Sequence, residues 1–183
     1  MNVPKETKEK MQATIDHFKG DLKNLRTNRA NPAMVEGVTV EVYGAPMRLK
    51  ELANITTPEA RQILITPFDP QTAQAIAKGI EKANLNLQAV VEGSSIRINV
   101  PPMDQSMRQE IVKQGKKKAE DAKIAIRDIR RKQNDLIKKQ KSSGEIPEDV
   151  MKKGEKEIQE LTDQFCKMID ELFSAKEKEI MAV

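Results

Sequence analysis

The sequence is poor in the residues from which metal sites, disulfide frameworks and aromatic cores are built. It has one cysteine, one histidine, no tryptophan and 3% aromatic residues among 183 residues. One cysteine excludes an internal disulfide framework. One cysteine with one histidine argues against a zinc site made of such ligands. The scarcity of aromatic rings argues against a platform on which nucleic-acid bases stack.

Long apolar runs and a targeting segment are also missing from the sequence. No stretch approaches the roughly 18 consecutive apolar residues that a membrane-spanning helix needs. Residues 1–10 are polar, unlike a secretory signal peptide. We therefore expect a cytoplasmic protein that has no membrane partner.

No motif of catalytic chemistry is present. Gly115 is followed by two lysines, but Glu110 stands where the first glycine of a phosphate-binding loop would be. His17 is more typical of a helix surface than of a catalytic centre. Cys166 has no histidine partner in the sequence and is better explained as a packing residue. We expect no enzyme and no cofactor.

Three stretches carry mainly apolar residues at alternating spacings of three and four, the pattern of helices with one apolar face. Their members are Met11, Ile15, Phe18, Leu22 and Leu25; then Ala119, Ala122, Ile126, Ile129, Gln133 and Leu136; then Ile158, Leu161, Phe165, Met168 and Leu172. Helices of this kind bury their apolar faces against one another. The sequence therefore predicts a three-helix bundle.

Local signals bound the second and third helices. Asp104 is a candidate N-cap, and Ser142, Ser143 and Gly144 end the helix that it begins. Pro147 suits the first turn of the third helix. A second helix of roughly 39 residues is about 58 Å long, so this helix and the third form a long antiparallel hairpin and the bundle is a rod.

Residues 31–103 have a different pattern, with short alternating strands and one helix. The strand positions are Val38, Val40 and Val42, then Ile63, Leu64 and Ile65, then Ile96, Ile98 and Val100. We expect a turn at Gly44-Ala45-Pro46 and a helix from Asp69 or Thr72 to about Ala83. The prediction is an α+β protein in which residues 1–30 and 104–183 form the bundle and residues 31–103 form an inserted small domain.

The chain crosses between these two predicted domains twice, at Asn31-Pro32 and at Pro101-Pro102. Proline disfavours a continuous helix. Two adjacent crossings are typical of a hinge, with a rigid corner as the alternative.

Basic residues are concentrated in the second helix. Residues 104–142 contain 13 basic and 6 acidic residues, whereas residues 143–183 contain 6 and 11. Six cations fall on one flank of that helix, and we call them the basic stripe: Lys116, Lys123, Arg127, Arg130, Arg131 and Lys138. Asn134 lies within the stripe and Glu120 is its one acid. Arg26 and Arg29, at the expected end of the first helix, add two guanidinium groups near the hinge.

Regularly spaced cations on a rigid helix match a phosphate backbone. With so few aromatics, the pattern favours structured RNA or DNA bound by shape and phosphates. One alternative is a solvated helix face. Others are a helical adaptor or chaperone-like protein that binds proteins through the hairpin, and an enzyme in the small domain. Three arginines within residues 127–131 exceed what solubility needs.

Four stretches together resemble the bacterial ribosome recycling factor family. They are Leu25-Arg26-Thr27-Asn28-Arg29-Ala30-Asn31-Pro32, Val40-Glu41-Val42-Tyr43-Gly44, Ile98-Asn99-Val100-Pro101-Pro102, and Arg127-Asp128-Ile129-Arg130-Arg131 with Asn134 and Asp135. The chain departs from the family at Asn28, where glycine is usual, and at Ser106-Met107, where an acidic-then-basic pair is usual.

The resemblance implies an L-shaped protein in which a β/α/β domain is joined to the rod by flexible hinges. It implies that the rod binds large-subunit ribosomal RNA and that elongation factor G with GTP acts on the small domain. The ribosomal subunits then separate, and messenger and transfer RNA are released. Arg130 and Arg127 would be the main RNA contacts, supported by Arg26, Arg29, Arg131 and Lys123. We expect a monomer that itself hydrolyses nothing.

Overall fold

The computed structural model describes residues 2–182, which divide by their contacts into two compact units. The helical unit comprises residues 2–25 and Gln109–Glu179, and the sheet unit comprises Arg26–Arg108 and residues 180–182. The α+β class predicted from the sequence is confirmed. No helix within residues 2–182 is long and apolar enough to cross a membrane.

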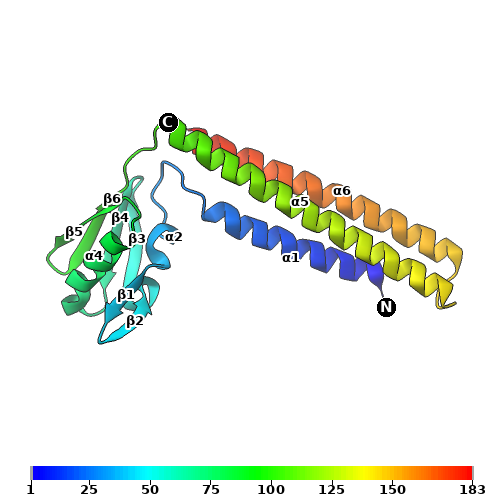
Figure 1. Ribbon diagram of the computed structural model, residues 1–183, viewed down its shortest axis with the longest axis horizontal. Helices are drawn as coiled ribbons and strands as arrows, with labels where there is room; N and C mark the ends of the chain where they lie inside the picture. Colours follow the sequence, from blue (N-terminus) through cyan, green and yellow to red (C-terminus); the bar gives the residue numbers. More distant parts are fainter. Residues whose placement is uncertain (1, 183) are drawn as a thin grey trace. The chain divides into compact units, whose positions relative to one another are not determined.

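Three long helices form the helical unit, as predicted: α1 (Val3–Lys23), α5 (Gln105–Ser142) and α6 (Glu148–Met181). Figure 1 shows α5 and α6 running side by side in opposite directions. The predicted N-cap of α5 is confirmed, because the backbone N–H of Met107 donates to Asp104 Oδ1 at 2.7 Å. Pro147 directly precedes α6, and its carbonyl accepts the N–H of Met151 at 3.1 Å.

Two apolar clusters in the interior of the helical unit are described within residues 2–182. The larger one contains Met11, Ile15, Phe18, Leu22, Ala119, Ala122, Ile126, Phe165 and Ile169. The smaller one contains Val3, Ile137 and Ile158. Along each helix a buried polar residue separates the members of the two clusters, namely Thr7, Gln133 and Thr162. Both threonine hydroxyls donate to the carbonyl four residues earlier, so they need no partner on another helix.

The predicted apolar faces of α5 and α6 are partly wrong in detail. Ile137 is buried where Leu136 was expected, and Ile169 is buried while Met168 lies at the edge. A helix that packs against two neighbours buries a broader face than one line of residues. The residue that the sequence predicts to be most buried on such a face can therefore differ by one position from the residue that is most buried in the structure.

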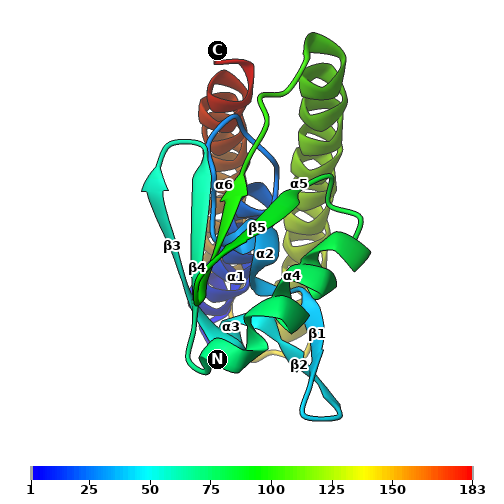
Figure 2. The ribbon, with the colours of Figure 1, turned by 90° about the vertical axis from the view of Figure 1, so that its left-hand side faces the viewer.

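The sheet unit combines two antiparallel sheets with short helices. In chain order its elements are α2 (Ala33–Glu36), β1 (Thr39–Val42), β2 (Ala45–Arg48), α3 (Leu49–Leu52), β3 (Ala53–Glu59), β4 (Gln62–Pro67), the 3₁₀ turn η1 (Pro70–Thr72), α4 (Ala73–Lys82), β5 (Gln88–Glu92) and β6 (Ser95–Asn99). Strands β1 and β2 form a hairpin, seen below the sheet in Figure 2, and the larger sheet has the order β3-β4-β6-β5, which the labels of Figure 1 follow.

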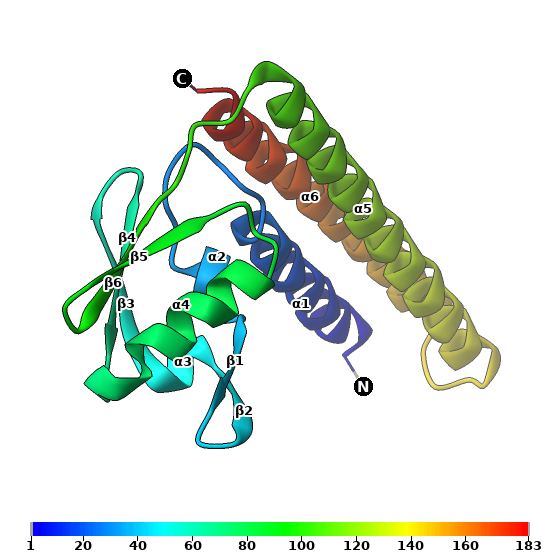
Figure 3. The ribbon, with the colours of Figure 1, turned by 60° about the vertical axis from the view of Figure 1, so that its left-hand side comes forward.

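The core of this unit lies between the larger sheet, α4 and β1. Ile63 pairs with Ile98 and Ile65 with Ile96 across β4 and β6, and all four side chains are fully buried. Helix α4 packs on β1 so closely that a Cβ atom added at Gly79 would lie 2.8 Å from a methyl carbon of Val40. Glycine is therefore required at this crossing, which Figure 3 shows from the side.

The turn predicted at Gly44-Ala45-Pro46 is displaced by one residue. Tyr43 and Gly44 both have positive φ, at 54° and 76°, and Val42 pairs with Ala45. These two residues therefore form the hairpin turn, and Pro46 lies within β2. Proline is tolerated there because β2 belongs to a sheet of only two strands.

Residues 26–30 and 104–108 group by contacts with the sheet unit, although the sequence assigns them to the bundle. Helix α1 ends at Lys23, so Arg26 and Arg29 follow the helix rather than ending it. Threonine and asparagine, which favour caps and turns over helix interiors, occupy positions 24, 27 and 28. The domain limits predicted from the sequence remain a prediction.

Candidate nucleic-acid interface

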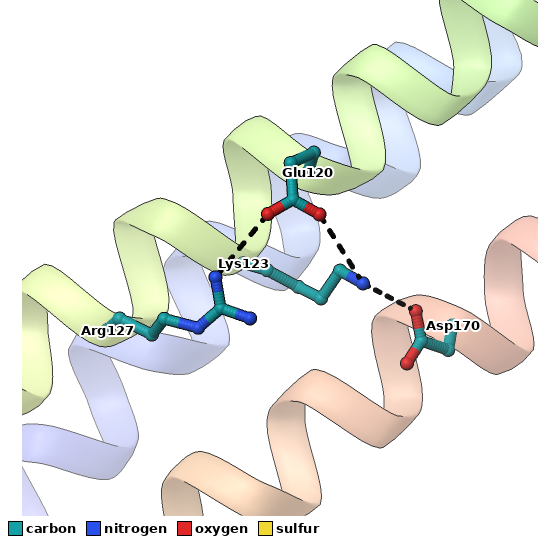
Figure 4. A network of polar contacts seen from close by, with 4 residues as sticks. All are labelled: Glu120, Lys123, Arg127 and Asp170. Atoms are coloured by element: carbon teal, nitrogen blue, oxygen red, sulfur yellow. Dashed lines mark hydrogen bonds and ion pairs between the residues drawn. The ribbon is translucent and has the colours of Figure 1, made fainter.

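The basic stripe lies on α5, and several residues of α6 reach it. Lys123 Nζ lies 3.0 Å from Asp170 Oδ1 of α6 and 3.6 Å from Glu120 Oε2 (Figure 4). The hydrogen bond to Asp170 raises the pKa of Lys123 above its ordinary value. The side chain of Lys123 is only 20% exposed. Lys123 therefore serves the packing of α5 on α6 and offers little free charge to a ligand.

Arg127 shares Glu120 with Lys123. Its Nη1 lies 3.4 Å from Glu120 Oε1, and half of its side chain is exposed (Figure 4). A guanidinium carries five N–H donors, so a single contact leaves most of them available. Because Glu120 and Asp170 balance Arg127 and Lys123, this part of the stripe has little net charge.

Arg130 is held by a neutral group instead of a carboxylate. Its Nη1 donates to Gln159 Oε1 of α6 at 3.4 Å, and Gln159 Nε2 donates to Asp163 Oδ1 at 3.0 Å. Within residues 2–182 no carboxylate lies within ion-pair distance of Arg130. The guanidinium is therefore oriented while its charge remains uncompensated, which is the arrangement that suits an anionic ligand.

The remaining cations of the stripe are exposed, and two of them are paired with carboxylates. Arg131 Nη2 lies 2.8 Å from Asp128 Oδ1, and its side chain is 73% exposed. Lys132 also binds Asp128 and, with Arg131, lowers the pKa of that carboxyl group. Lys138 Nζ lies 3.8 Å from Glu155, and Lys116 is exposed. These side chains add exposed positive charge to the surface of α5.

Arg26 and Arg29 belong to the sheet unit and not to the unit that carries the stripe. Arg26 Nη2 donates to the carbonyl of Pro101 at 3.0 Å, and Nη1 contacts Met107 Sδ at 3.3 Å. Arg26 therefore ties the first chain crossing to the second. Arg29 is exposed.

The predicted hinge residues make local contacts at the same crossings. Asn31 Oδ1 accepts the N–H of Ala33 at 3.0 Å and so starts α2 directly after Pro32. Pro101 accepts from Arg26, and Pro102 follows it as exposed chain. These contacts hold Asn31 and Pro101 within the sheet unit.

Sequence reasoning missed the α6 residues that orient the cations, above all Gln159 and Asp170. Their position opposite the stripe depends on how α6 is rotated against α5, which no local pattern specifies. One local signal was available: Gln159 and Asp163 are four residues apart, a spacing at which side chains on a helix surface form hydrogen bonds.

Neither a metal-binding cluster nor an activated thiol is found within residues 2–182. Within residues 2–182 no three histidine, cysteine, aspartate or glutamate residues are placed to hold a metal ion. Burial raises the pKa of the Cys166 thiol, although Arg127 and Lys123 oppose this shift. A thiol with a raised pKa is a poor nucleophile at neutral pH.

The fold and the stripe define an α+β binding protein with a helical unit and a sheet unit. The ribosome recycling factor family model matches residues 18–181. The chain therefore belongs to the ribosome recycling factor family, whose members are translation factors and not enzymes. Its function is ribosome recycling, and a general helical adaptor is not favoured.

Individual relatives are similar over the whole chain. The ribosome-recycling factor of Chlamydia abortus is 46% identical over 183 residues, covering 100% of both chains. That of Bacillus licheniformis is 44% identical over 181 residues, covering 99% of this chain and 98% of the relative.

Two of the solved structures with the same fold are both ribosome recycling factors. A solution structure of a ribosome recycling factor matches with a TM-score of 0.74 and 36% identity, covering 99% of this chain and 96% of that one. A second match has a TM-score of 0.65 and 35% identity, covering 100% of both chains. It describes models for the T. thermophilus ribosome recycling factor and E. coli elongation factor G bound to the E. coli post-termination complex.

Proposed function

We propose that this protein binds the post-termination ribosome through the basic stripe and acts there with elongation factor G and GTP. The subunits then separate, and messenger and transfer RNA are released in the cytoplasm. Membership of the recycling factor family supports this role. One structural relative is described together with elongation factor G on a post-termination complex, which supports elongation factor G as the partner of this protein.

Large-subunit ribosomal RNA is the proposed ligand of the stripe, with Arg130 as its main contact. The observation that carries this assignment is the neutral amide of Gln159, which orients the guanidinium at 3.4 Å without neutralising it. Arg127 is the second contact, because Glu120 occupies only part of its guanidinium. Arg131 and Lys116 support them, and Arg29 and Arg26 act from the sheet unit.

The two domains predicted from the sequence act as separate bodies in this proposal. Residues 1–30 with 104–183 anchor the protein, and residues 31–103 respond to the GTPase. Asn31, Pro32, Pro101 and Pro102 form the hinge between them. The protein acts as a monomer. The division of the chain into two compact units supports the assignment of two domains.

The RNA assignment is tested by Arg130→Ala with Lys132→Ala as the matched control. Both changes remove one cation from the same region of α5, but Lys132 is paired with Asp128 at 2.8 Å. We expect Arg130→Ala to weaken cosedimentation with ribosomes and to reduce the slope of log affinity against log salt by about 0.7–0.9. Lys132→Ala should change neither appreciably.

Circular dichroism of both variants verifies that their helix content is unchanged. Equal ribosome affinity and equal salt slope for the two variants would contradict the assignment of Arg130.

A further inference from the structure

Asp163 of α6 is joined to Arg130 of α5 through the side-chain amide of Gln159. The Nε2 group of Gln159 donates to Asp163 Oδ1 at 3.0 Å, and its Oε1 accepts from Arg130 Nη1 at 3.4 Å. We call Asp163, Gln159 and Arg130 the relay. Its first two members lie four residues apart on α6, and all three belong to the helical unit.

The chemistry of the three groups fixes the direction of both hydrogen bonds. A carboxylate only accepts, a guanidinium only donates, and a primary amide donates at one end and accepts at the other. With its NH₂ group bonded to Asp163, Gln159 presents its oxygen to Arg130. With the amide turned round, two donors would face each other at Arg130 and two acceptors at Asp163. Asp163 therefore selects the orientation of the amide that holds the guanidinium.

An ion pair does not explain the position of Asp163. Within residues 2–182 no basic side chain lies within ion-pair distance of its carboxylate, and Lys167, one turn further along α6, lies 3.9 Å from Glu171 instead. The hydrogen bond from Gln159 is therefore the contact through which Asp163 acts on its surroundings.

The amide also keeps the carboxylate from neutralising Arg130. Arg127, by contrast, contacts the carboxylate of Glu120 directly at 3.4 Å (Figure 4). A carboxylate beside an RNA-binding surface repels phosphates, so by its charge alone Asp163 is unfavourable for binding. In the relay its effect on Arg130 is orientation, and the guanidinium keeps its free charge.

We propose that Asp163 is a positioning residue for RNA binding, which orients the guanidinium of Arg130 by holding the amide of Gln159. The inference rests on the proposed function, in which Arg130 is the main contact to ribosomal RNA. It predicts the opposite of simple electrostatics. Removal of an acid should strengthen binding to RNA through charge alone, whereas loss of the relay weakens it.

The test compares Asp163→Ala with Asp16→Ala as the matched control. On α1, Gln12 Nε2 donates to Asp16 Oδ1 at 3.1 Å, which is the same pair at the same spacing. Within residues 2–182 no arginine donates to Gln12. Both variants therefore lose one exposed acid and one hydrogen bond on a helix surface, and they differ in the link to Arg130.

A conservative variant, Asp163→Asn, separates the accepted hydrogen bond from the charge. Asparagine has no charge but keeps an oxygen that accepts from Gln159. If Asp163 acts through the relay, Asp163→Asn should bind ribosomes at least as tightly as the unaltered protein.

The measurement is cosedimentation of each full-length variant with ribosomes over a range of salt concentrations. We expect Asp163→Ala to weaken binding about threefold to tenfold, the net effect of one hydrogen bond. The slope of log affinity against log salt should stay unchanged, because Arg130 keeps its charge. Asp16→Ala should bind as tightly as the unaltered protein or more tightly. When Arg130 is already alanine, Asp163→Ala should cause no further weakening.

Binding by Asp163→Ala that equals or exceeds that of Asp16→Ala would overturn the proposal. Equal weakening by Asp163→Asn and Asp163→Ala would also overturn it, because the charge and not the hydrogen bond would then matter. In both cases Arg130→Ala would still weaken binding. Failure of the proposed function is a different result, in which Arg130→Ala itself leaves ribosome affinity unchanged, and it overturns both proposals.

Discussion

The cations of the basic stripe differ in the side chain that each one contacts. Arg130 is oriented by an amide, whereas Lys123, on the same stripe, is neutralised by two carboxylates. The sequence shows both residues as equivalent cations on one flank of a helix. Only the structure separates the residue that packs the bundle from the one that is free to bind an anion.

The ionisation of Tyr43 can be followed by ultraviolet absorbance without interference, because the chain has one tyrosine and no tryptophan. The hydrogen bond to Asp69 raises the pKa of the Tyr43 hydroxyl above its ordinary value of about 10. We expect the phenolate absorbance to appear at higher pH than in a free tyrosine. Asp69→Asn should lower the midpoint, because the negative charge is removed.

The raised pKa of Tyr43 also links the Tyr43–Asp69 contact to stability. The contribution is fully present below the tyrosine pKa of the unfolded chain and is lost as pH rises through the folded pKa. A midpoint at the ordinary value in the unaltered protein would show that this hydrogen bond is absent in solution.

At the scale of elements, the three long helices and α4 could be predicted from the sequence, whereas the short helices α2 and α3 and the pairing of the strands could not. The bounds of α5 and α6 lie close to those predicted, because caps and long apolar periods are local signals. Strand β3 was missed because it is largely exposed and contains Pro58. Strand β5 was missed as well, because its adjacent Val90 and Val91 do not alternate with polar residues. The contact of Gln159 with Arg130 depends on the rotation of α6 against α5, which no local pattern encodes.

Two helix glycines of the helical unit have opposite expected effects when replaced by alanine. A Cβ atom at Gly20 would have no neighbour within 4 Å, so Gly20→Ala should stabilise α1 by about 0.5–1 kcal/mol. A Cβ atom at Gly115 would lie 2.7 Å from Phe173 and 3.2 Å from Leu25. Overpacking costs about 1–3 kcal/mol, which outweighs the gain in helix propensity, so Gly115→Ala should destabilise the protein.

Urea unfolding of both glycine variants gives the sign of each effect. Stabilisation by Gly115→Ala equal to that of Gly20→Ala would show that α5 is not packed closely at this position.

At the scale of the whole molecule, segments far apart in the sequence meet at Asn28. Its Oδ1 accepts the N–H of Met103 at 3.0 Å, and its Nδ2 donates to the carbonyl of Ala182 at 2.6 Å. The backbone at Asn28 does not have positive φ, so the side chain is used for these bonds and not for a left-handed turn. The departure from the usual glycine therefore adds contacts between both crossings and the C-terminal segment.

Asn28→Ala should release these contacts and cost about 1–3 kcal/mol, the combined effect of two hydrogen bonds. The measurement is hydrogen exchange at the amide of Met103, which should become faster. Asn28→Asp keeps the acceptor for that amide and loses the donor to Ala182, so it should keep the protection. Equal exchange rates in the alanine variant and the unaltered protein would contradict the role of Asn28.

The central claim is that the protein separates ribosomal subunits together with a GTPase. The most direct measurement is sedimentation of post-termination ribosomes mixed with this protein, elongation factor G and GTP, together and with each one left out. The account predicts that free subunits appear only in the complete mixture. Ribosomes that stay whole in the complete mixture, with no cosedimentation of the protein at low salt, would contradict it.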